Sequence, residues 1–393
     1  MNPLPGAESA ALELPPPDAT AVACSKRLAQ IIAARIELRG GVIGFDEYMR
    51  MALYQPGFGY YSGDSIKFGA CGDFVTAPEI SPLFGACLAR QAGALIEQGC
   101  AARILEIGAG SGRLCGQIMA SLPALRHYQI LDLSAALKQR QQRYLRARLS
   151  AEHFSRIEWL TSLPEAFDGI VIANELLDAM PVHILQKQGD WRELGVGYDG
   201  RRFAWRAIEP AREVLHAIRG IEARLGELPP DYRCELNLNL RPWFKALAQS
   251  CRHAVAIIVD YGFEQDEYYH PARAQGTLGC YYQHLVHSDP LIYPGLQDIT
   301  AYVDFDACAD AAEAGGFAIT GLVAQHRFLM ANGLLDEAQR LSAGTDVRAQ
   351  LAIAQQVKTL SLPQEMGQQF KVLAMQKNLA LDMPAMRRSH ARG

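Results

Sequence analysis

Residues 103–117 read Arg-Ile-Leu-Glu-Ile-Gly-Ala-Gly-Ser-Gly-Arg-Leu-Cys-Gly-Gln. The segment begins with a short apolar run, which is typical of a strand buried on both faces. Gly108, Gly110 and Gly112 follow, and they let the backbone turn tightly and approach a ligand because no Cβ is in the way. A helical pattern begins after them. This order of strand, glycine turn and helix predicts the first βα unit of a nucleotide-type binding site.

Two acidic residues beside this turn decide between candidate ligands. The dinucleotide fingerprint is Gly-x-Gly-x-x-Gly, but here the spacing is Gly-x-Gly-x-Gly, and Glu106 precedes it within the strand. This anion would repel a diphosphate, whereas it suits a ligand that carries a sulfonium and an amine. Asp132 follows 20 residues after Gly112 (132 − 112), where a carboxylate can bind ribose hydroxyls. The pattern favours S-adenosylmethionine over NAD; the alternative is a glycine turn that only packs helix against strand.

Strand and helix patterns alternate around this unit, which predicts the α/β class with a doubly wound, mostly parallel sheet. We expect strands at 103–107, 128–132, 156–160, 168–173, 254–260, 317–324 and 369–376, and helices at 84–98, 113–121, 134–148, 305–314 and within 334–360.

The chain of 393 residues is too long for one simple core, so additions to the sheet are expected. We predict a disordered leader over 1–24, a cap of helices (25–39 and 45–54) and a glycine-rich loop over 25–100, a core over 101–380, and a flexible tail over 381–393. Two insertions are expected in the core: a β-meander followed by a helical passage at about 182–245, and a long loop at 261–303.

Composition limits the function classes. A formal charge of −4, from 38 basic and 42 acidic residues, argues against broad nucleic-acid binding. No apolar run approaches the roughly 20 residues of a membrane helix, and no Lys or Arg precedes Lys26, so neither membrane insertion nor a targeting peptide is expected. Nine cysteines without a Cys-x-x-Cys pair indicate reduced thiols and a cytoplasmic protein. No metal is predicted, because His270, His284, His287 and Asp289 match no zinc spacing.

Five segments carry a resemblance to a known family. They are Gly72-Asp-Phe-Val-Thr-Ala-Pro-Glu-Ile-Ser-Pro-Leu-Phe-Gly85, the loop Glu106–Gly112, Ala173-Asn-Glu-Leu-Leu-Asp-Ala-Met-Pro-Val-His183, Asp260-Tyr-Gly262, and a loop that begins Gly276-Thr-Leu-Gly-Cys280 and runs to Asp304. With them the chain, from about 25 to about 380, resembles the MidA-like family of class I S-adenosylmethionine-dependent methyltransferases. The family includes the mitochondrial complex I assembly factor that dimethylates an arginine. Two departures are mild: Leu176 and Leu177 stand where the family has aromatic residues, and Asp132 where it usually has Glu.

The resemblance implies a Rossmann-like sheet of seven strands with the last strand antiparallel, S-adenosylmethionine as cofactor, and a protein-arginine substrate, a complex I core subunit. We assign the cofactor to Glu106, Gly108, Gly110, Gly112, Asp132 and Asn174. Carboxylates can bind a guanidinium through its fork of donors and accept its proton. Asn174, Glu175 and Asp178 are therefore the first catalytic candidates, and Asp73 with Glu79 the second pair.

Each of these assignments has a structural alternative. Glu175 and Asp178 could be acids of a first helical turn, and Asp73 and Glu79 could cap turns. Tyr60 and Tyr61 could form a wall of the substrate or adenine pocket. The enzyme could instead methylate another protein, RNA or a small molecule, or the chain could be an assembly chaperone that binds S-adenosylmethionine without turnover. It could also form a homodimer.

Overall fold

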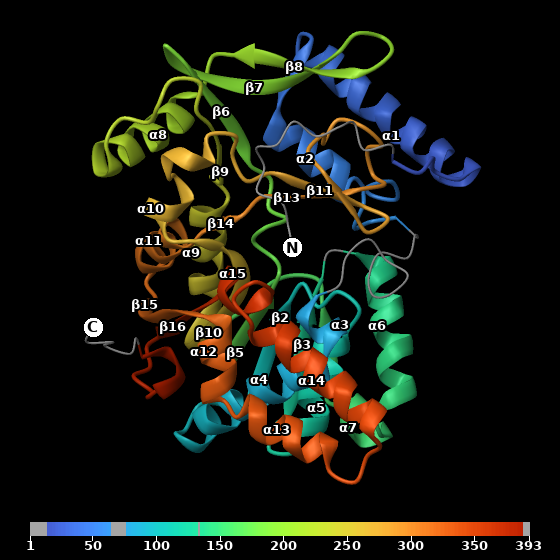
Figure 1. The fold of residues 1–393 in the computed structure, drawn as a ribbon, viewed down its shortest axis with the longest axis vertical. Coiled ribbons are helices and arrows are strands. Elements are labelled where there is room, and N and C mark those ends of the chain that lie inside the picture. Colours follow the sequence, from blue (N-terminus) through green and yellow to red (C-terminus); the bar gives the residue numbers. More distant parts are fainter. Residues whose placement is uncertain (1–13, 64–75, 133, 388–393) are drawn as a thin grey trace.

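The computed structural model of the protein describes residues 14–63, 76–132 and 134–387. It has two parts, which contain three sheets between them (Figure 1). The lower part in that view holds the large sheet, and the upper part holds two smaller sheets with the N-terminal helices. The α/β class is confirmed. No helix among the described residues is long and apolar enough to cross a membrane.

The large sheet has the strand order β15-β16-β10-β5-β2-β3-β4, and the short β14 is an eighth strand that pairs with β10. Neighbours from β4 to β10 are parallel, and only β16 runs against both its neighbours. A seven-stranded sheet with an antiparallel last strand is therefore confirmed. The strands are β2 (Arg103–Ile107), β3 (His127–Leu131), β4 (Ile157–Leu160), β5 (Phe167–Asn174), β10 (Cys251–Phe263), β14 (Val303–Asp304), β15 (Ala318–Ala324) and β16 (Phe370–Lys377).

Alternate residues of these strands face two hydrophobic cores, as the pleat of a strand requires. Ile104 and Ile170 face one core, whereas Leu105 and Val171 face the other. The first core is covered by α4 (Pro82–Glu97), α5 (Arg113–Ser121), α6 (Ala135–Arg148), α7 (Ala151–Ser155), α12 (Gln325–Ala331), α13 (Leu334–Ser342) and α14 (Val347–Ser361). The second is covered by α9 (Leu240–Ser250) and α11 (Phe305–Gly315).

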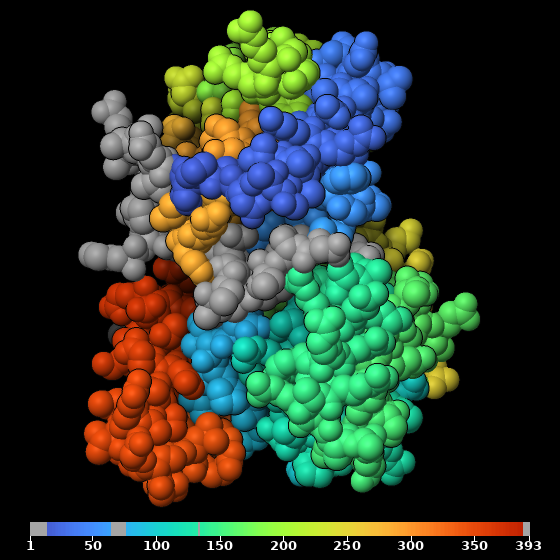
Figure 2. Space-filling model, turned by 90° about the vertical axis from the view of Figure 1, so that its right-hand side faces the viewer, coloured from blue at the N-terminus to red at the C-terminus, as the bar shows by residue number. Residues whose placement is uncertain are grey.

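The helix α4 corrects one predicted boundary. We expected the cap to extend to residue 100, but Phe84 and Leu88 of α4 are buried in the first core of the large sheet. The helix packs beside α5 and α13, and the space-filling view shows it next to the C-terminal helices (Figure 2). The cap therefore ends before α4, because the apolar face of this helix is needed to cover the sheet.

The second sheet joins segments that the sequence analysis separated. Its path is β1-β7-β6-β9, and β8 pairs with β7. The strands are β1 (Val42–Gly44), β6 (His183–Gln188), β7 (Asp190–Tyr198), β8 (Phe203–Ile208) and β9 (Arg233–Leu236). The predicted meander is confirmed as β6 to β8. Ile43 pairs with Val196, so the cap and the first insertion share one sheet. The predicted helical passage was wrong at β9, which follows α8 (Arg212–Leu225) and pairs with β6.

A third, small sheet lies in the region predicted as a long loop. Strands β11 (Gly279–Tyr282), β12 (Leu285–His287) and β13 (Asp298–Thr300) form it in the order β12-β11-β13. The short helix α10 (Gln265–Tyr268) and a 3₁₀ turn (Pro271–Arg273) precede it. It packs with α1 (Ala19–Leu38) and α2 (Phe45–Tyr54) in one core of the upper part. The loop prediction is therefore wrong for these strands, each of which has only three or four residues.

Both predicted chain ends need correction as well. Helix α1 begins at Ala19, within the predicted leader, because the Asp18 side chain accepts a hydrogen bond from the amide of Ala21 (2.8 Å) and caps it. Near the other end, a 3₁₀ turn (Pro384–Met386) buries Met383 and Met386 against the first core. Residues 381–387 therefore do not belong to a flexible tail.

Candidate active site

A pocket of about 710 Å³ lies at the carboxyl ends of β2, β3 and β5. Ligands of open α/β sheets bind at this edge. Its lining residues come from the glycine loop, the two neighbouring strand ends, α2, the segment 76–79 and the start of α9. Of the residues assigned from sequence, the lining includes Glu79, Glu106, Gly108, Gly110, Asp132, Asn174 and Glu175. Gly112 and Asp178 do not line it, and Asp73 lies outside the described residues.

The glycine loop has the conformation that its sequence predicted. Gly108, Gly110 and Gly112 have φ values of 75°, 53° and 85°, in the left-handed region that favours glycine. A Cβ on Gly108 would come within 2.9 Å of Leu176 Cδ1. Gly112 is the N-cap of α5, and a Cβ there would lie 3.3 Å from Gln141 Cγ. Gly108 thus shapes the pocket floor, whereas Gly112 allows close packing behind it.

Glu106 is buried beneath this loop, with 2% of its surface exposed. The Tyr128 hydroxyl donates a hydrogen bond to its Oε2 atom (2.8 Å). Burial raises the pKa of Glu106 to about 7, although this hydrogen bond opposes the shift. Burial disfavours the charged form of this carboxylate. A cationic group in the pocket would offset that cost and would therefore stabilise the ionised form.

Asp132 follows β3 directly and is linked to the glycine loop by a residue that the sequence analysis missed. The Gln141 amide donates to Asp132 Oδ2 (3.0 Å) and to the Gly110 carbonyl (3.0 Å), and its oxygen accepts from Trp159 (3.0 Å). Gln141 is fully buried between Leu137 and Leu145 on the inner face of α6. A polar residue at a core-facing position of a helix was the signal that could have revealed this role.

The turn after β5 carries Glu175 and Asp178, and Asp260 of β10 holds it in place. Asp260 Oδ2 accepts hydrogen bonds from the amides of Leu176 (3.1 Å), Leu177 (2.8 Å) and Asp178 (3.4 Å). Glu175 has φ 51°, which is uncommon for a residue other than glycine. Residues 175–180 form turns rather than a helix, so the alternative of a first helical turn is wrong.

The carboxyl groups of Glu175 and Asp178 lie in a low-dielectric environment. Burial, followed by the charge of Asp178, raises the pKa of Glu175 to about 8. Burial raises the pKa of Asp178 to about 6. Glu175 Oε1 accepts hydrogen bonds from the Asn174 amide (3.1 Å) and from the backbone amide of Ala77 (3.2 Å).

Glu79 has a different position from the one expected of a second catalytic pair. It lies in the short helix α3 (Ala77–Ile80), where its carboxylate contacts Ser111 of the glycine loop and forms an ion pair with Arg113. These contacts tie α3 to the loop and to the start of α5. Because Ala77 in the same helix contacts Glu175, α3 connects the cofactor side of the pocket with the acidic turn.

The tyrosine wall was only partly predicted. Tyr61 lines the pocket, but Tyr60 is buried in the upper core with 1% of its surface exposed and does not line it. Tyr54 takes its place: its ring stacks on Tyr61 (5.5 Å between centroids), and its hydroxyl donates to the Ala179 carbonyl (2.9 Å). A stacked aromatic pair therefore forms the wall contributed by the upper part.

The residues present fit S-adenosylmethionine. A pocket of this size is within the range of about 300–1,000 Å³ that small-molecule ligands need. Asn174 lines it, and its Oδ1 atom is buried without a hydrogen-bond partner among the described residues, so an amine donor would satisfy this oxygen. Glu106 offers a negative charge for the cationic end, and Asp132 offers acceptor oxygens for ribose hydroxyls.

A second pocket, of about 250 Å³, adjoins the first at Glu175. It also contains Asp178, together with Asp298 of β13. Glu175 is the one described residue that lines both pockets. The turn after β5 therefore connects two spaces, and Asp178 belongs to the second of them.

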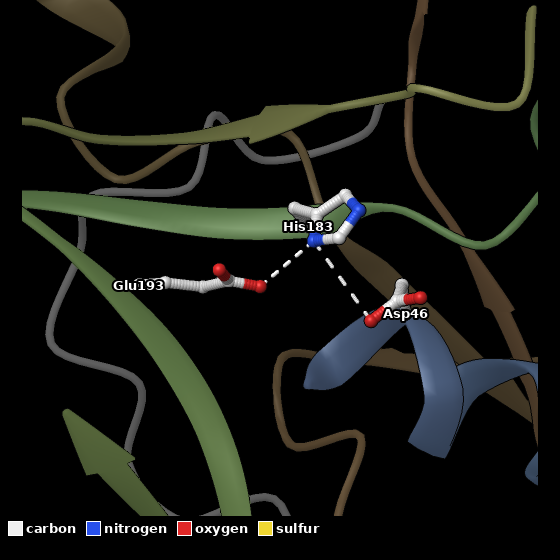
Figure 3. A group of neighbouring side chains, drawn as sticks. All are labelled: Asp46, His183 and Glu193. Carbon is white, nitrogen blue, oxygen red and sulfur yellow. Dashed lines mark hydrogen bonds and ion pairs between the residues drawn. The ribbon is translucent and has the colours of Figure 1, made fainter. Parts of the chain in front are cut away.

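One cluster of possible metal ligands lies outside both pockets. His183 of β6 points between Glu193 of β7 and Asp46 at the start of α2 (Figure 3). Its Nδ1 atom is 2.7 Å from Glu193 Oε1 and 3.8 Å from Asp46 Oδ1. Although burial disfavours the charged ring, the hydrogen bond to Glu193 and the charge of Asp46 raise the pKa of His183. The three side chains compensate one another as an ion triad that fastens α2 to the second sheet.

This sheet order, with a glycine loop after β2 and an acid after β3, defines a class I S-adenosylmethionine-dependent methyltransferase. The chain belongs to a family of S-adenosyl-L-methionine-dependent methyltransferases whose model, Methyltransf_28, matches residues 87–323. It is similar to a protein from Burkholderia thailandensis whose crystal structure contains S-adenosyl-homocysteine, with 40% identity and a TM-score of 0.90 over 96% of this chain and 99% of that one.

Two curated relatives are more distant. One is the "Protein arginine methyltransferase NDUFAF7 homolog, mitochondrial" of Drosophila melanogaster, 29% identical over 88% of this chain and 84% of the relative. The other is the "Protein arginine methyltransferase NDUFAF7, mitochondrial" of Homo sapiens, 28% identical over 85% of this chain and 80% of the relative. The expected cofactor is thus confirmed by the family and by the ligand of the bacterial structure.

Proposed function

We propose that the protein is a protein-arginine N-methyltransferase. Its substrate would be a core subunit of respiratory complex I, as the family resemblance implies, methylated in the cytoplasm during assembly. The observation that carries the proposal is the position of Glu175, which lines both the cofactor pocket and the acidic second pocket. The names of the insect and human relatives support the same chemistry.

The acids suit this reaction because a guanidinium is always protonated in proteins and presents several donors in one plane. When bound, S-adenosylmethionine supplies a methyl group from its sulfonium, and the sulfur keeps the electron pair of the broken bond. The new carbon–nitrogen bond forms at a terminal nitrogen of the guanidinium. Glu175 and Asp178 orient that nitrogen, and one of them takes the proton that it loses.

Asp178 is the better proton acceptor of the two. At neutral pH its pKa of about 6 leaves it largely ionised, whereas the pKa of about 8 keeps Glu175 largely protonated. Glu175 then holds the nucleophile at the boundary between the pockets. A guanidinium beside Asp178 would offset the cost of burying its charge, so its arrival favours the ionised form of this acid.

The test is labelling of a cell extract with S-adenosylmethionine that carries an isotopic methyl group, followed by mass spectrometry of the modified residues. We expect label on arginine of a protein, including a complex I subunit. Label on RNA, a small molecule or another amino acid would contradict the proposal. The variant Glu175→Gln should still bind S-adenosylhomocysteine but lose the labelling. Cofactor binding by the wild type without any transfer would instead favour the chaperone.

A further inference from the structure

The second pocket lies where three distant parts of the chain meet. Its walls come from the turn after β5, from β10 to β13, and from the connection between α14 and β16 that contains α15 (Met366–Gln369). Gln364 and Glu365 of this connection are exposed, whereas Asp178 and Asp298 are buried. The pocket therefore runs from the protein surface at residues 364–365 inward to Glu175.

The charge of this pocket has one sign. Glu175, Asp178, Asp298 and Glu365 are among its lining residues, and none of the described lining residues is Lys or Arg. Only 6% of Asp178 and 2% of Asp298 are exposed. A buried carboxylate such as that of Asp178 is costly unless it is protonated, hydrogen-bonded or joined by a cation. The pocket is therefore suited to a positively charged ligand.

One carboxylate oxygen has no partner of its own. Asp178 Oδ1 is buried and accepts no hydrogen bond from any described residue. Orphaned buried acceptors are rare in proteins, and they are often satisfied by a ligand. Because Asp178 lines the second pocket and not the first, a donor that satisfies this oxygen would come from the second pocket.

Aromatic side chains form the rest of the wall. Tyr261, Tyr281, Tyr302 and Phe370 all line the pocket. The ring of Tyr261 packs edge-on against Tyr302 (4.9 Å between centroids) and tilted against Phe370 (5.4 Å). The Tyr261 hydroxyl donates to Thr300 Oγ1 (2.5 Å), which keeps the ring in place. Aromatic rings bind cations through their faces, and they bind planar guanidinium groups best of all.

The volume of the pocket excludes a whole cofactor, and the arrangement of its acids excludes a metal ion. A volume of about 250 Å³ is less than a whole cofactor needs, but it can hold a side chain. A metal ion requires ligands that converge on one point. Among the described residues, only Asp46, His183 and Glu193 bring three such atoms within 4.8 Å of one another, and they lie elsewhere. The described acids of the second pocket do not converge in this way.

We propose that the second pocket binds the arginine side chain of the protein substrate, which enters beside Glu365 and delivers its guanidinium to Asp178 and Glu175. This inference rests on the proposed function. Asp298 holds the guanidinium on its way to the methyl donor. The Tyr61 hydroxyl donates to both oxygens of Asp298 (2.9 and 3.0 Å), and Tyr61 itself lines the cofactor pocket. Tyr61 and Asp298 thus form part of the partition between cofactor and substrate.

The probe is the peptide acetyl-Gly-Arg-Gly-amide, titrated into the full-length protein saturated with S-adenosylhomocysteine and followed by NMR or calorimetry. Matched peptides carry citrulline or lysine in place of arginine. We expect the arginine peptide to bind the wild type. Asp298→Asn should weaken it by roughly 10-fold to 100-fold, because a charge-assisted hydrogen bond is lost. Glu365→Gln, at the exposed mouth, should weaken it by about two- to threefold.

The control variant is Asp289→Asn, which removes the same charge from an exposed position between β12 and β13, outside both pockets. It should bind the peptide like the wild type. S-adenosylhomocysteine binding shows whether each variant is folded. The inference is overturned if folded Asp298→Asn and Glu365→Gln both bind the arginine peptide normally. Equal binding of the citrulline or lysine peptide also overturns it.

The two proposals fail in different experiments. If extract labelling finds methylarginine but the pocket variants bind and methylate normally, the proposed function stands and the substrate pocket is wrong. If the peptide binds in an Asp298-dependent way but no protein arginine becomes labelled, the proposed function is wrong. The peptide titration does not depend on transfer, so it measures the pocket alone.

Discussion

The two pockets on either side of Glu175 differ in how the chain builds them. The floor of the cofactor pocket comes from one continuous βα unit, in which Glu106 and Gly108 follow each other along the chain. The second pocket is assembled from residues as far apart as Asp178, Asp298 and Phe370. A local motif thus fixes the methyl donor, whereas tertiary folding brings together the groups that would select the acceptor.

This difference has a functional consequence. The donor pocket is built on a segment whose backbone geometry tolerates little change, because its glycines have positive φ values. The proposed acceptor pocket is lined by side chains from three separate parts of the chain. Substitutions should therefore separate the two pockets: some should remove transfer without affecting the cofactor, and others should do the reverse.

The largest difference between the effect on methyl transfer and the effect on cofactor binding is expected from Asp178→Asn. The variant keeps the shape of the turn but removes the proposed proton acceptor, so methyl transfer should fall by roughly 10²–10⁴-fold. Binding of S-adenosylhomocysteine, measured by calorimetry, should stay within about twofold. The control is Asp168→Asn, since Asp168 lies at the far end of β5, the strand that precedes the turn of Asp178. Normal turnover of Asp178→Asn would remove this residue from the mechanism.

Asp132→Ala should have the reverse effect. Ribose hydroxyls would lose a half-buried, charged acceptor, and Gln141 would lose its contact with the acid, so affinity for S-adenosylhomocysteine should fall by roughly 10-fold to 100-fold. Binding of the arginine peptide to the second pocket should change little in this variant. Unchanged cofactor affinity would show that Asp132 holds only the loop.

One pocket is built on a local segment and the other is assembled from distant segments. This difference also explains which features could be predicted from the sequence. Strand β2 and helix α5 have the predicted bounds, because an apolar run, a glycine turn and a helical pattern are local signals. Their pairing with β3 and β5 follows from the rules for alternating strands and helices. Glu106, Gly108 and Asp132 could therefore be placed in the pocket from spacing alone.

The second pocket could not be predicted in this way. Asp298 belongs to a three-residue strand inside a segment that reads as loop, and it meets Asp178 only because β13 packs beside the turn after β5. The pairing of Ile43 with Val196 was equally hidden, since no local pattern reports a partner more than a hundred residues away. Strands this short give little hydrophobic periodicity, and their pairing depends on tertiary context.

A smaller effect should appear in the pH dependence of cofactor binding. Glu106 has a pKa of about 7 in the free protein, and a cationic ligand favours its ionised form. Affinity for S-adenosylmethionine should therefore decrease as the pH falls below 7, by at most about tenfold per pH unit. Calorimetry between pH 6 and 8 measures the slope. Glu106→Gln should bind more weakly and show a flatter slope; equal slopes in both proteins would contradict the assignment.

The smallest effect concerns the ion triad behind the wall of the cofactor pocket. Glu193 and Asp46 raise the pKa of His183 in the folded protein. The stabilisation by its charged form is therefore complete below the ordinary histidine pKa of about 6.5 and is lost as the pH rises through the folded value. His183→Gln should lower the free energy of unfolding by about 1 kcal/mol at pH 6 and by less at pH 9.

Urea denaturation at the two pH values measures this difference, and the exposed His216 on α8, changed to Gln, is the control. The triad fastens the start of α2, and Tyr54 at the end of α2 forms the pocket wall. A loss of stability that is larger at pH 9 than at pH 6 would show that His183 is neutral in the fold. His183→Gln could also lower the affinity for the cofactor, with a free-energy change larger than its effect on unfolding. The wall of the first pocket would then depend on distant contacts, as the second pocket does. That result would weaken the contrast between a local and an assembled pocket.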